Sequence, residues 1–439
     1  MKRQPDRRLR VVVVDHTAEM GGAEVALLRL LRGLDTGQVD VRVLLFRDGP
    51  LVEALRAAGG LVQVVPLATD VTGVDRATAG RASWANLVRA ARVVPFVVGL
   101  ARRWRRLRPD LVVTTSLKAD LLGGVAARLA GRRLVWHLHD RIADDYLPGP
   151  LVRLVRAASR RLPHLVIANS RATAATVPVG CLVVPPGIDD DWVLDEATVA
   201  ARPGPGPHPV VGLIGRLSPT QGPREFVRAA ALVARDYPGA VFRIVGGALF
   251  DGDDYAARVR AEQQALGLDV GWTGFVADPR VQLDDLDVLV HASPVPEPFG
   301  QVIVEAMVRG VPVVATRAGG AVEIVAPGQA LETGPEAGPE MGTATGAATG
   351  TATGAEDVAA GLDLGVLVAP GDPDSLADGI ASVLADPASA RLRAVAARAS
   401  AGRRFDAQDT AARVSAAWHR VAGGQTRTIR TDRAAGWLS

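Results

Sequence analysis

Short runs of apolar residues recur along the first part of the chain, and stretches with helical spacing of apolar positions separate most of them. An apolar run of about four to eight residues between turn signals is consistent with a strand buried in a parallel sheet. The pattern therefore predicts a doubly wound α/β domain. The expected strands are 9–15, 39–46, 61–65, 111–115, 134–139, 165–169 and 182–185. The expected helices include 23–34, 84–107 and 151–162.

A Pro- and Gly-rich segment, residues 201–207, interrupts this alternation, which then begins again. A length of 439 residues also suits two domains better than one. We therefore expect two doubly wound, Rossmann-like α/β domains facing a central cleft, the usual place for a ligand. The expected boundaries are 1–187 for the N-terminal domain, 188–208 for a linker and 209–404 for the C-terminal domain. The second domain should contain strands 210–215, 241–245, 288–291 and 313–316 and a helix over 226–234.

A glycine stands at every fourth position from Gly334 to Gly354, and Thr, Ala, Pro and Glu fill most of the positions between. This composition cannot support a packed core. We therefore expect a flexible insertion over 328–362, ahead of a strand at 365–368. The tail 423–439 is expected to be disordered.

Two glutamates, Glu297 and Glu305, flank a Pro-Phe-Gly segment near the middle of the second predicted domain. Gly300 permits a tight turn, apolar residues from Gln301 onward recur at helical spacing, and Gly310 ends the helix. The helix start between the carboxylates offers unpaired N–H groups to an anion, and carboxylates accept hydrogen bonds from sugar hydroxyls. The plainer alternative is a helix with one solvated glutamate and one favoured by the helix dipole.

An apolar strand and the turn Gly319-Gly320 follow this helix, as in one unit of a parallel α/β sheet. Residues 297–323 closely resemble the donor-binding segment of the family-4 retaining glycosyltransferases, which have the GT-B fold. The resemblance implies a hexosyltransferase that moves a sugar from a nucleoside-diphosphate sugar to an acceptor hydroxyl. It further implies retention of anomeric configuration, no metal or other cofactor, and a last helix, 405–422, that crosses back to the first domain.

The resemblance also implies roles for individual residues. Glu297 would bind hydroxyls of the transferred sugar, Glu305 the ribose, and His139 would stabilise the sugar during transfer; Glu297 and His139 are thus the candidate catalytic residues. A covalent intermediate on Glu297 is the alternative route. The candidate donor-binding residues are Gly21, Gly22, Arg216, Gln221, Phe299, Gly300, Gln301, Val302 and Glu305.

Gly21 and Gly22 follow the first predicted strand and open a helix. Glycines there let the backbone approach a phosphate at a helix N-terminus, although a tight strand–helix turn would also use them. The dinucleotide fingerprint G-x-G-x-x-G is absent, which argues against a nicotinamide enzyme.

Arg216 can grip a diphosphate through its fork of donors. In the resembled family a lysine normally stands where Gln221 stands, so this chain lacks one positive charge of the usual phosphate clamp. Arg224, one helical turn further along, either replaces that charge or is a surface arginine.

His137 and His139 lie on one face of a predicted strand, but no cysteine or third histidine stands nearby, so we expect no metal there. His137 is expected to be a supporting or core residue, and Asp140 to orient His139 or contact an acceptor hydroxyl. No functional role is expected for His16 or His291. Two acidic clusters have ligands that Mg²⁺ accepts, but both are expected to be solvated loops without metal. They are 189–191 and 251–254.

The net charge of +3 is too mild to argue for nucleic-acid binding, despite a pI of about 9.5. The single Cys181 excludes an internal disulfide framework. We found no secretory signal and expect a cytoplasmic protein. The segment 93–108 joins an apolar run to five arginines. It is either a peripheral contact with an anionic membrane or a core-packed helix with a solvated end.

Two rival functions fit the same architecture. A nucleotide-sugar epimerase would convert its donor without an acceptor, and a catalytically silent module would bind the nucleotide sugar only, for which Gln221 is the hint. The identities of the sugar, the base and the acceptor stay open. The acceptor would be a glycan, a lipid-linked sugar or a small molecule.

Overall fold

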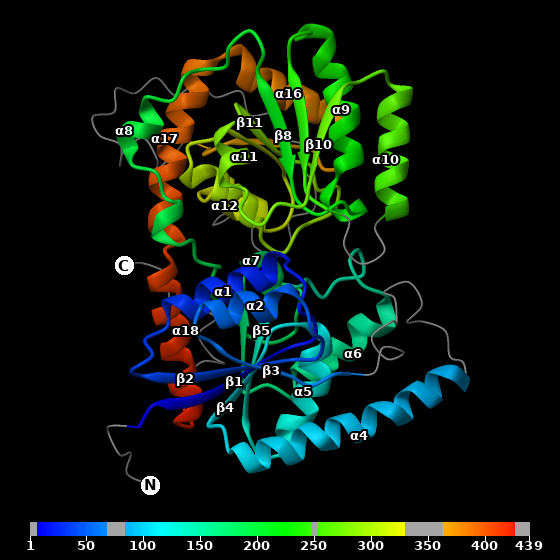
Figure 1. Ribbon diagram of the computed structural model, residues 1–439, viewed down its shortest axis with the longest axis vertical. Coiled ribbons are helices and arrows are strands. Elements are labelled where there is room, and N and C mark those ends of the chain that lie inside the picture. Colours follow the sequence, from blue (N-terminus) through cyan, green and yellow to red (C-terminus); the bar gives the residue numbers. More distant parts are fainter. Residues whose placement is uncertain (1–6, 68–83, 248–252, 330–362, 426–439) are drawn as a thin grey trace. The chain divides into compact units, whose positions relative to one another are not determined.

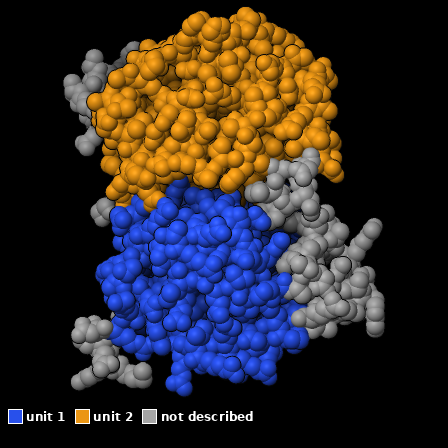
Figure 2. Space-filling view, in the orientation of Figure 1, with its two compact units in different colours: residues 1–187, 407–439 blue, residues 188–406 orange. Residues whose placement is uncertain are grey.

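The computed structural model describes residues 7–67, 84–247, 253–329 and 363–425. The chain divides into two compact units, one of residues 1–187 and 407–439 and one of residues 188–406 (Figure 2). Nearly all of the predicted glycine-rich insertion, from residue 330, and the tail from residue 426 lie outside the described residues.

The first unit is built on a seven-stranded sheet whose neighbouring strands are all parallel (Figure 1). The strand order is β3-β2-β1-β4-β5-β6-β7. The strands are β1 (Leu9–Asp15), β2 (Val39–Leu45), β3 (Leu61–Val64), β4 (Leu111–Thr114), β5 (Arg133–Leu138), β6 (Leu165–Ala168) and β7 (Leu182–Val183).

Helices cover both faces of this sheet. Successive side chains of a strand point to opposite faces, so the apolar residues of each strand contribute to a core on either side. Val11 and Val13 of β1 belong to the core that also contains residues of α1, α2 and α18, whereas Val12 and Val14 belong to the core beneath α4, α5 and α6. The helices are α1 (Gly22–Gly33), α2 (Pro50–Ala57), α4 (Trp84–Leu107), α5 (Leu117–Leu129), α6 (Gly149–Ser159), α7 (Arg171–Ala174) and α18 (Ala407–Ala422).

The last helix, α18, packs against α1 in the first unit although it follows the whole second unit in sequence. Its residues Ala411, Val414 and Trp418 are buried in the same core as Val11 and Val13. The apolar side of this helix is therefore part of the first unit's core.

The second unit contains a six-stranded, all-parallel sheet with the order β10-β9-β8-β11-β12-β13. Helices again cover both faces, with α9 and α16 on one core and α12, α13 and α17 on the other. The strands are β8 (Val210–Ile214), β9 (Val241–Val245), β10 (Val270–Gly274), β11 (Val288–His291), β12 (Val313–Thr316) and β13 (Val366–Val368). The helices are η1 (Asp190–Trp192), α8 (Glu196–Ala200), η2 (Pro219–Gln221), α9 (Pro223–Asp236), α10 (Asp253–Ala265), α11 (Arg280–Asp284), α12 (Gln301–Val308), α13 (Gly320–Val325), α16 (Pro373–Ala385) and α17 (Pro387–Arg404).

The segment predicted as a linker, 188–208, differs from that expectation. Ile188 and Trp192 are buried in the core of the second unit, and Ile188 forms a bridge with Asp406. The first part of this segment is thus packed structure that includes η1 and α8, because its apolar side chains are covered by the second unit. The strand β10 was not predicted, because its residues Val270–Gly274 alternate between buried and exposed instead of forming an apolar run.

Candidate active site

The loop that carries Glu297 lies directly on the glycine turn between β12 and α13. Gly319 has φ 63°, and a Cβ built on it would lie 2.2 Å from the carbonyl oxygen of Glu297. A Cβ on Gly320 would lie 2.5 Å from Cα of Phe299, and the Gly320 amide donates a hydrogen bond of 2.9 Å to the Glu297 carbonyl. Two backbones thus meet where no side chain fits, which fixes the position of Glu297.

Helix α12 begins immediately after this loop. Its N-cap residue is Gly300, whose φ of 108° favours glycine. The helix places Glu305 in its second turn, buried, while Gln301 and Val302 in its first turn are half-buried. The predicted helix and its glycine boundaries are confirmed. Phe299 is 5% exposed and packs edge-on against Phe405, so its side chain belongs to the core and only its main chain remains for a donor.

Each oxygen of the Glu297 carboxylate has a hydrogen-bond donor from the protein. The Nε2 amide of Gln221 donates to Oε1 over 2.5 Å, and Nε2 of His291 donates to Oε2. Burial raises the pKa of this carboxyl, but His291, Gln221 and the charge of Arg216 lower it by more, so the pKa lies below its usual value. Glu297 is therefore an ionised carboxylate in a fixed orientation.

Gln221 is brought to Glu297 by a glycine and a serine. Gly222 has φ 72°, and a Cβ there would lie 1.9 Å from the carbonyl oxygen of Ala292, so only glycine allows η2 to approach the segment after β11. The Ser293 hydroxyl donates to the carbonyl oxygen of Thr220 over 2.6 Å. These contacts hold the loop after β8 against the loop after β11.

The two candidate phosphate-binding arginines differ in their surroundings. Arg216, two residues after β8, is half-buried and has no side-chain hydrogen bond to any described residue. Its charge is close enough to Glu297 to lower the pKa of that carboxyl. Arg224 is half-exposed and donates to Glu262 over 2.6 Å. The structure thus favours a surface role for Arg224 over replacement of the missing lysine charge.

No functional role was expected for His291, but the structure places its ring on the Glu297 carboxylate. The residue ends β11, the strand next to β8 and β12 in the centre of the sheet. The available signal was its place at the carboxyl end of a central strand, six positions before Glu297.

In the first unit, Gly21 and Gly22 stand where β1 leads into α1. The Glu24 carboxylate accepts a hydrogen bond of 3.1 Å from the Gly21 amide and so caps the helix. Burial, helped by the charge of Asp15, raises the pKa of Glu24 to about 8. One of the amides of the glycine loop is therefore occupied by a protein carboxyl.

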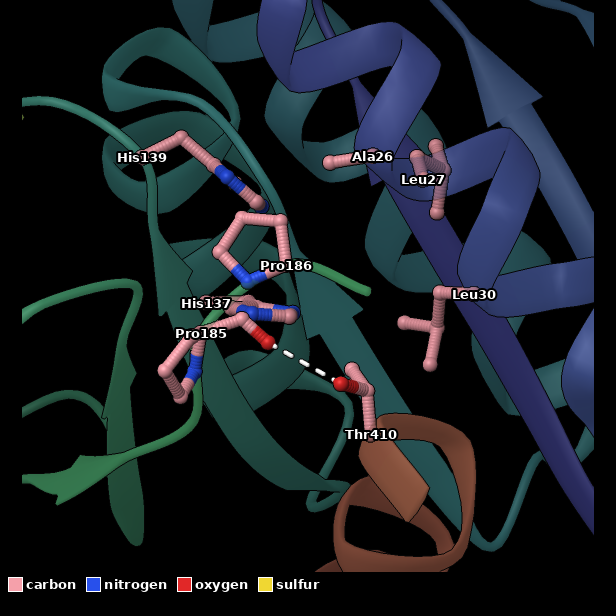
Figure 3. Close-up of a pocket in the computed structure, with 8 residues that line it drawn as sticks. All are labelled: Ala26, Leu27, Leu30, His137, His139, Pro185, Pro186 and Thr410. Carbon is pink, nitrogen blue, oxygen red and sulfur yellow. Dashed lines mark hydrogen bonds between the residues drawn. The ribbon is translucent and has the colours of Figure 1, made fainter. Parts of the chain in front are cut away.

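His139 lies just after β5, above the ring of His137, with 4.5 Å between ring centroids. Both line a small pocket of the first unit opposite side chains of α1 (Figure 3). Burial lowers the pKa of the His139 imidazole, although Asp140 and Asp15 raise it, and the net shift is downward. The carboxylate of Asp140 accepts a hydrogen bond of 3.0 Å from the Tyr146 hydroxyl. The lining residues are Ala26, Leu27, Leu30, His137, His139, Pro185, Pro186 and Thr410.

Among the residues that the structure describes, no group of three or more His, Cys, Asp or Glu side chains is placed to hold a metal ion. Within the same part of the chain, no helix has both the length and the apolar character needed to cross a membrane. The predicted acidic cluster 251–254 lies partly outside the described residues.

Comparisons with known proteins show which family this chain resembles. Residues 20–192 match Glycosyltransferase Family 4, and residues 197–337 match Glycosyl transferases group 1. The 2-deoxystreptamine N-acetyl-D-glucosaminyltransferase of Streptomyces fradiae is 31% identical over 343 residues, which cover 69% of this chain and 76% of that protein. The D-inositol 3-phosphate glycosyltransferase of Segniliparus rotundus is 34% identical, over 41% of this chain and 43% of that protein.

Solved structures agree with the sequence comparisons. The structure of Anabaena Alr3699/HepE in complex with UDP-glucose is 25% identical and has a TM-score of 0.71, covering 94% of this chain and all of that chain. The sucrose-phosphate synthase of Thermosynechococcus elongatus, 18% identical over 95% of this chain and all of that chain, shares the fold with a TM-score of 0.69. The chain therefore belongs to the group 1 glycosyltransferases, which have the GT-B fold.

Proposed function

We propose that this glycosyltransferase moves a sugar from a nucleoside-diphosphate sugar to an acceptor hydroxyl, with retention of anomeric configuration and without a metal or other cofactor. The single observation that carries the proposal is the Glu297 loop, in which an oriented carboxylate immediately precedes the start of α12. The N–H groups of that start favour a diphosphate. Glu305, on the same helix, accepts hydrogen bonds from the ribose hydroxyls.

The departing diphosphate is the group on which charge develops during transfer. Arg216 and the start of α12 supply positive charge and hydrogen-bond donors to it. On the first unit, His139 stabilises the sugar during transfer as a largely neutral imidazole, in keeping with its lowered pKa. The Gly21-Gly22 loop offers close backbone approach to the phosphates or the acceptor.

Glu297 acts as a hydrogen-bond acceptor for sugar hydroxyls and not as a nucleophile. Gln221 and His291 each already donate to one of its oxygens, and such donors reduce the nucleophilicity of a carboxylate. The bond between the anomeric carbon and the diphosphate breaks, and the acceptor oxygen bonds to that carbon on the same face of the sugar. The proton of the acceptor hydroxyl passes to the departing diphosphate.

A cyclitol is the acceptor class that we propose to test first. The relatives include enzymes named for D-inositol 3-phosphate and for 2-deoxystreptamine, and both compounds are polyhydroxylated six-membered carbocycles. A UDP-sugar is the first donor to test, because UDP-glucose is bound in the solved structure of Anabaena HepE.

The test incubates the protein with a panel of UDP- and GDP-sugars, with and without cyclitols, glycans and lipid-linked sugars as acceptors, in the presence of EDTA. Diphosphate release that depends on an acceptor, with a product of the donor's anomeric configuration by NMR, supports the proposal. Conversion of the donor without an acceptor would indicate an epimerase, and binding without turnover a silent module. A product of inverted configuration would overturn the proposed retention, and loss of activity in EDTA would overturn the proposed independence of metal.

We also propose a cytoplasmic protein that contacts an anionic membrane through α4. On the described part of this helix, Val94 is exposed, and Arg102 and Arg106 are exposed nearer its C-terminal end. Arginines beside apolar surface suit an anionic bilayer. Co-sedimentation with anionic but not with zwitterionic vesicles, reduced when Arg102 and Arg106 are changed to glutamate, supports this contact. Equal recovery with both vesicle types contradicts it.

A further inference from the structure

His291 and Gln221 approach the Glu297 carboxylate from two different loops and meet different oxygens. Gln221 ends η2 after β8, and His291 ends β11. Both β8 and β11 lie in the centre of the sheet and are hydrogen-bonded to each other. The two donors therefore lie at or just after the ends of the two central strands of the second unit.

The His291 ring is fixed in place by burial. It is 4% exposed, and its Nδ1 has no hydrogen-bond partner among the described residues. Within the described part of the chain, the ring therefore makes one hydrogen bond, from Nε2 to Glu297. A buried polar atom without a hydrogen bond, such as this Nδ1, destabilises the fold. A histidine at this position therefore suggests that its hydrogen bond to Glu297 has a use beyond stability.

The Glu297 side chain, by contrast, is 18% exposed. A carboxylate oxygen has two lone-pair sites. Among the described residues, Gln221 takes one site on one oxygen and His291 one site on the other, which leaves one site on each oxygen for a ligand. With both protein bonds in place, the carboxylate cannot rotate, and the two remaining sites point in fixed directions.

We infer that His291 is a positioning residue for sugar transfer, which works with Gln221 to orient Glu297 toward two hydroxyls of the transferred sugar. This inference rests on the proposed function and extends it to residues that do not contact the substrate themselves. Catalysis depends on hydrogen-bond acceptors held in place before the reaction begins. The same donors lower the pKa of Glu297 against the effect of burial and keep it ionised.

Two variants at position 291 separate orientation from simple packing. His291→Leu removes the donor, whereas His291→Gln keeps an N–H group at a comparable distance from the backbone. We expect His291→Leu to lower kcat/KM about 10- to 100-fold, the range for a lost hydrogen bond to a charged group. His291→Gln should recover most of this loss. The affinity for the free nucleoside diphosphate should stay within about twofold in both variants, since that ligand lacks the sugar.

A double-mutant cycle with Glu297→Gln supplies the decisive comparison. If His291 acts through Glu297, His291→Leu adds less than about a twofold loss once Glu297 is already glutamine. The control is His208→Leu, in the same unit, whose exposed ring bonds the carbonyl oxygen of Gly239 and should leave activity unchanged.

Equal losses from His291→Leu with and without Glu297→Gln would overturn the inference, and so would a loss of diphosphate affinity in step with activity. If the wild type turns over a nucleotide sugar and the His291→Leu variant does so equally well, this inference alone is overturned. A wild-type protein that neither binds nor turns over any nucleotide sugar would overturn it together with the proposed function.

Discussion

Gly319 lies so close to Glu297 that a Cβ on the glycine would be 2.2 Å from the glutamate's carbonyl oxygen. With φ 63°, Gly319 also has a backbone conformation that other residues rarely adopt. We predict that Gly319→Ala displaces the Glu297 loop and lowers transfer activity at least about tenfold, since small displacements of catalytic groups cost rate. Initial rates at saturating donor provide the measurement.

A second glycine separates displacement from backbone strain. Gly267 has nearly the same φ, 64°, but no atom within 4 Å of its built Cβ. Gly267→Ala should cost about 1 kcal/mol of stability and leave activity unchanged. Equal activity of Gly319→Ala and Gly267→Ala would show that the close contact with Glu297 is not the reason for glycine at position 319.

Arg216 and Arg224 should differ sharply in their effect on donor use. Arg216 has no side-chain hydrogen bond to a described residue, whereas Arg224 is paired with Glu262 at the surface. We expect Arg216→Ala to weaken diphosphate binding about 10- to 100-fold, as for a lost charge-assisted bond. Arg224→Ala should change binding less than about twofold, because exposed ion pairs contribute little. Calorimetric titration with UDP and GDP measures both, and a stronger effect at Arg224 would reverse the assignment.

Glu24 should make the stability of the protein depend on pH. Its pKa in the folded protein is about 8, compared with a usual value of 4.5. The folded state therefore holds a proton that the unfolded state releases, so this contribution to stability is present below pH 4.5 and is lost as the pH rises to about 8. Glu24→Gln keeps an acceptor for the Gly21 amide and removes the titration.

We expect Glu24→Gln to be more stable than the wild type by about 1 to 3 kcal/mol at pH 8.5, with a much smaller difference at pH 5. Urea unfolding at the two pH values tests this, with Glu53→Gln, at an exposed position of α2, as the control. The same loss of stability with rising pH in wild type and Glu24→Gln would show that another group is responsible.

The sequence predicted most strands of both sheets within one or two residues, because buried parallel strands are continuous apolar runs. It missed β10, whose residues include Gly271 and Gly274 and alternate in burial. It also placed a linker where Ile188 and Trp192 are packed, since a short apolar segment beside Pro- and Gly-rich sequence has no periodicity to reveal it.

Within the candidate site, sequence spacing predicted the positions of residues that lie in one short segment of the chain. Gly300, Gln301 and Glu305 belong to one turn and one helix, so their sequence pattern fixes their geometry. The bond from Gln221 to Glu297 joins positions 76 apart and depends on the glycine at 222, so no local pattern could reveal it. The contact of His291 was missed although this residue stands only six positions before Glu297, because the loop between them has no periodic pattern that predicts its path.

The proposed function requires Glu297 and Glu305 to hold a nucleotide sugar beside the start of α12. The most direct measurement compares the wild type with Glu297→Gln/Glu305→Gln for diphosphate release from the best nucleotide sugar, together with the melting temperature of each. We expect the double variant to have a rate at least about 100-fold lower, consistent with the loss of two hydrogen-bonded charges, at a closely similar melting temperature. An unchanged rate and unchanged affinity for the nucleotide sugar would contradict it.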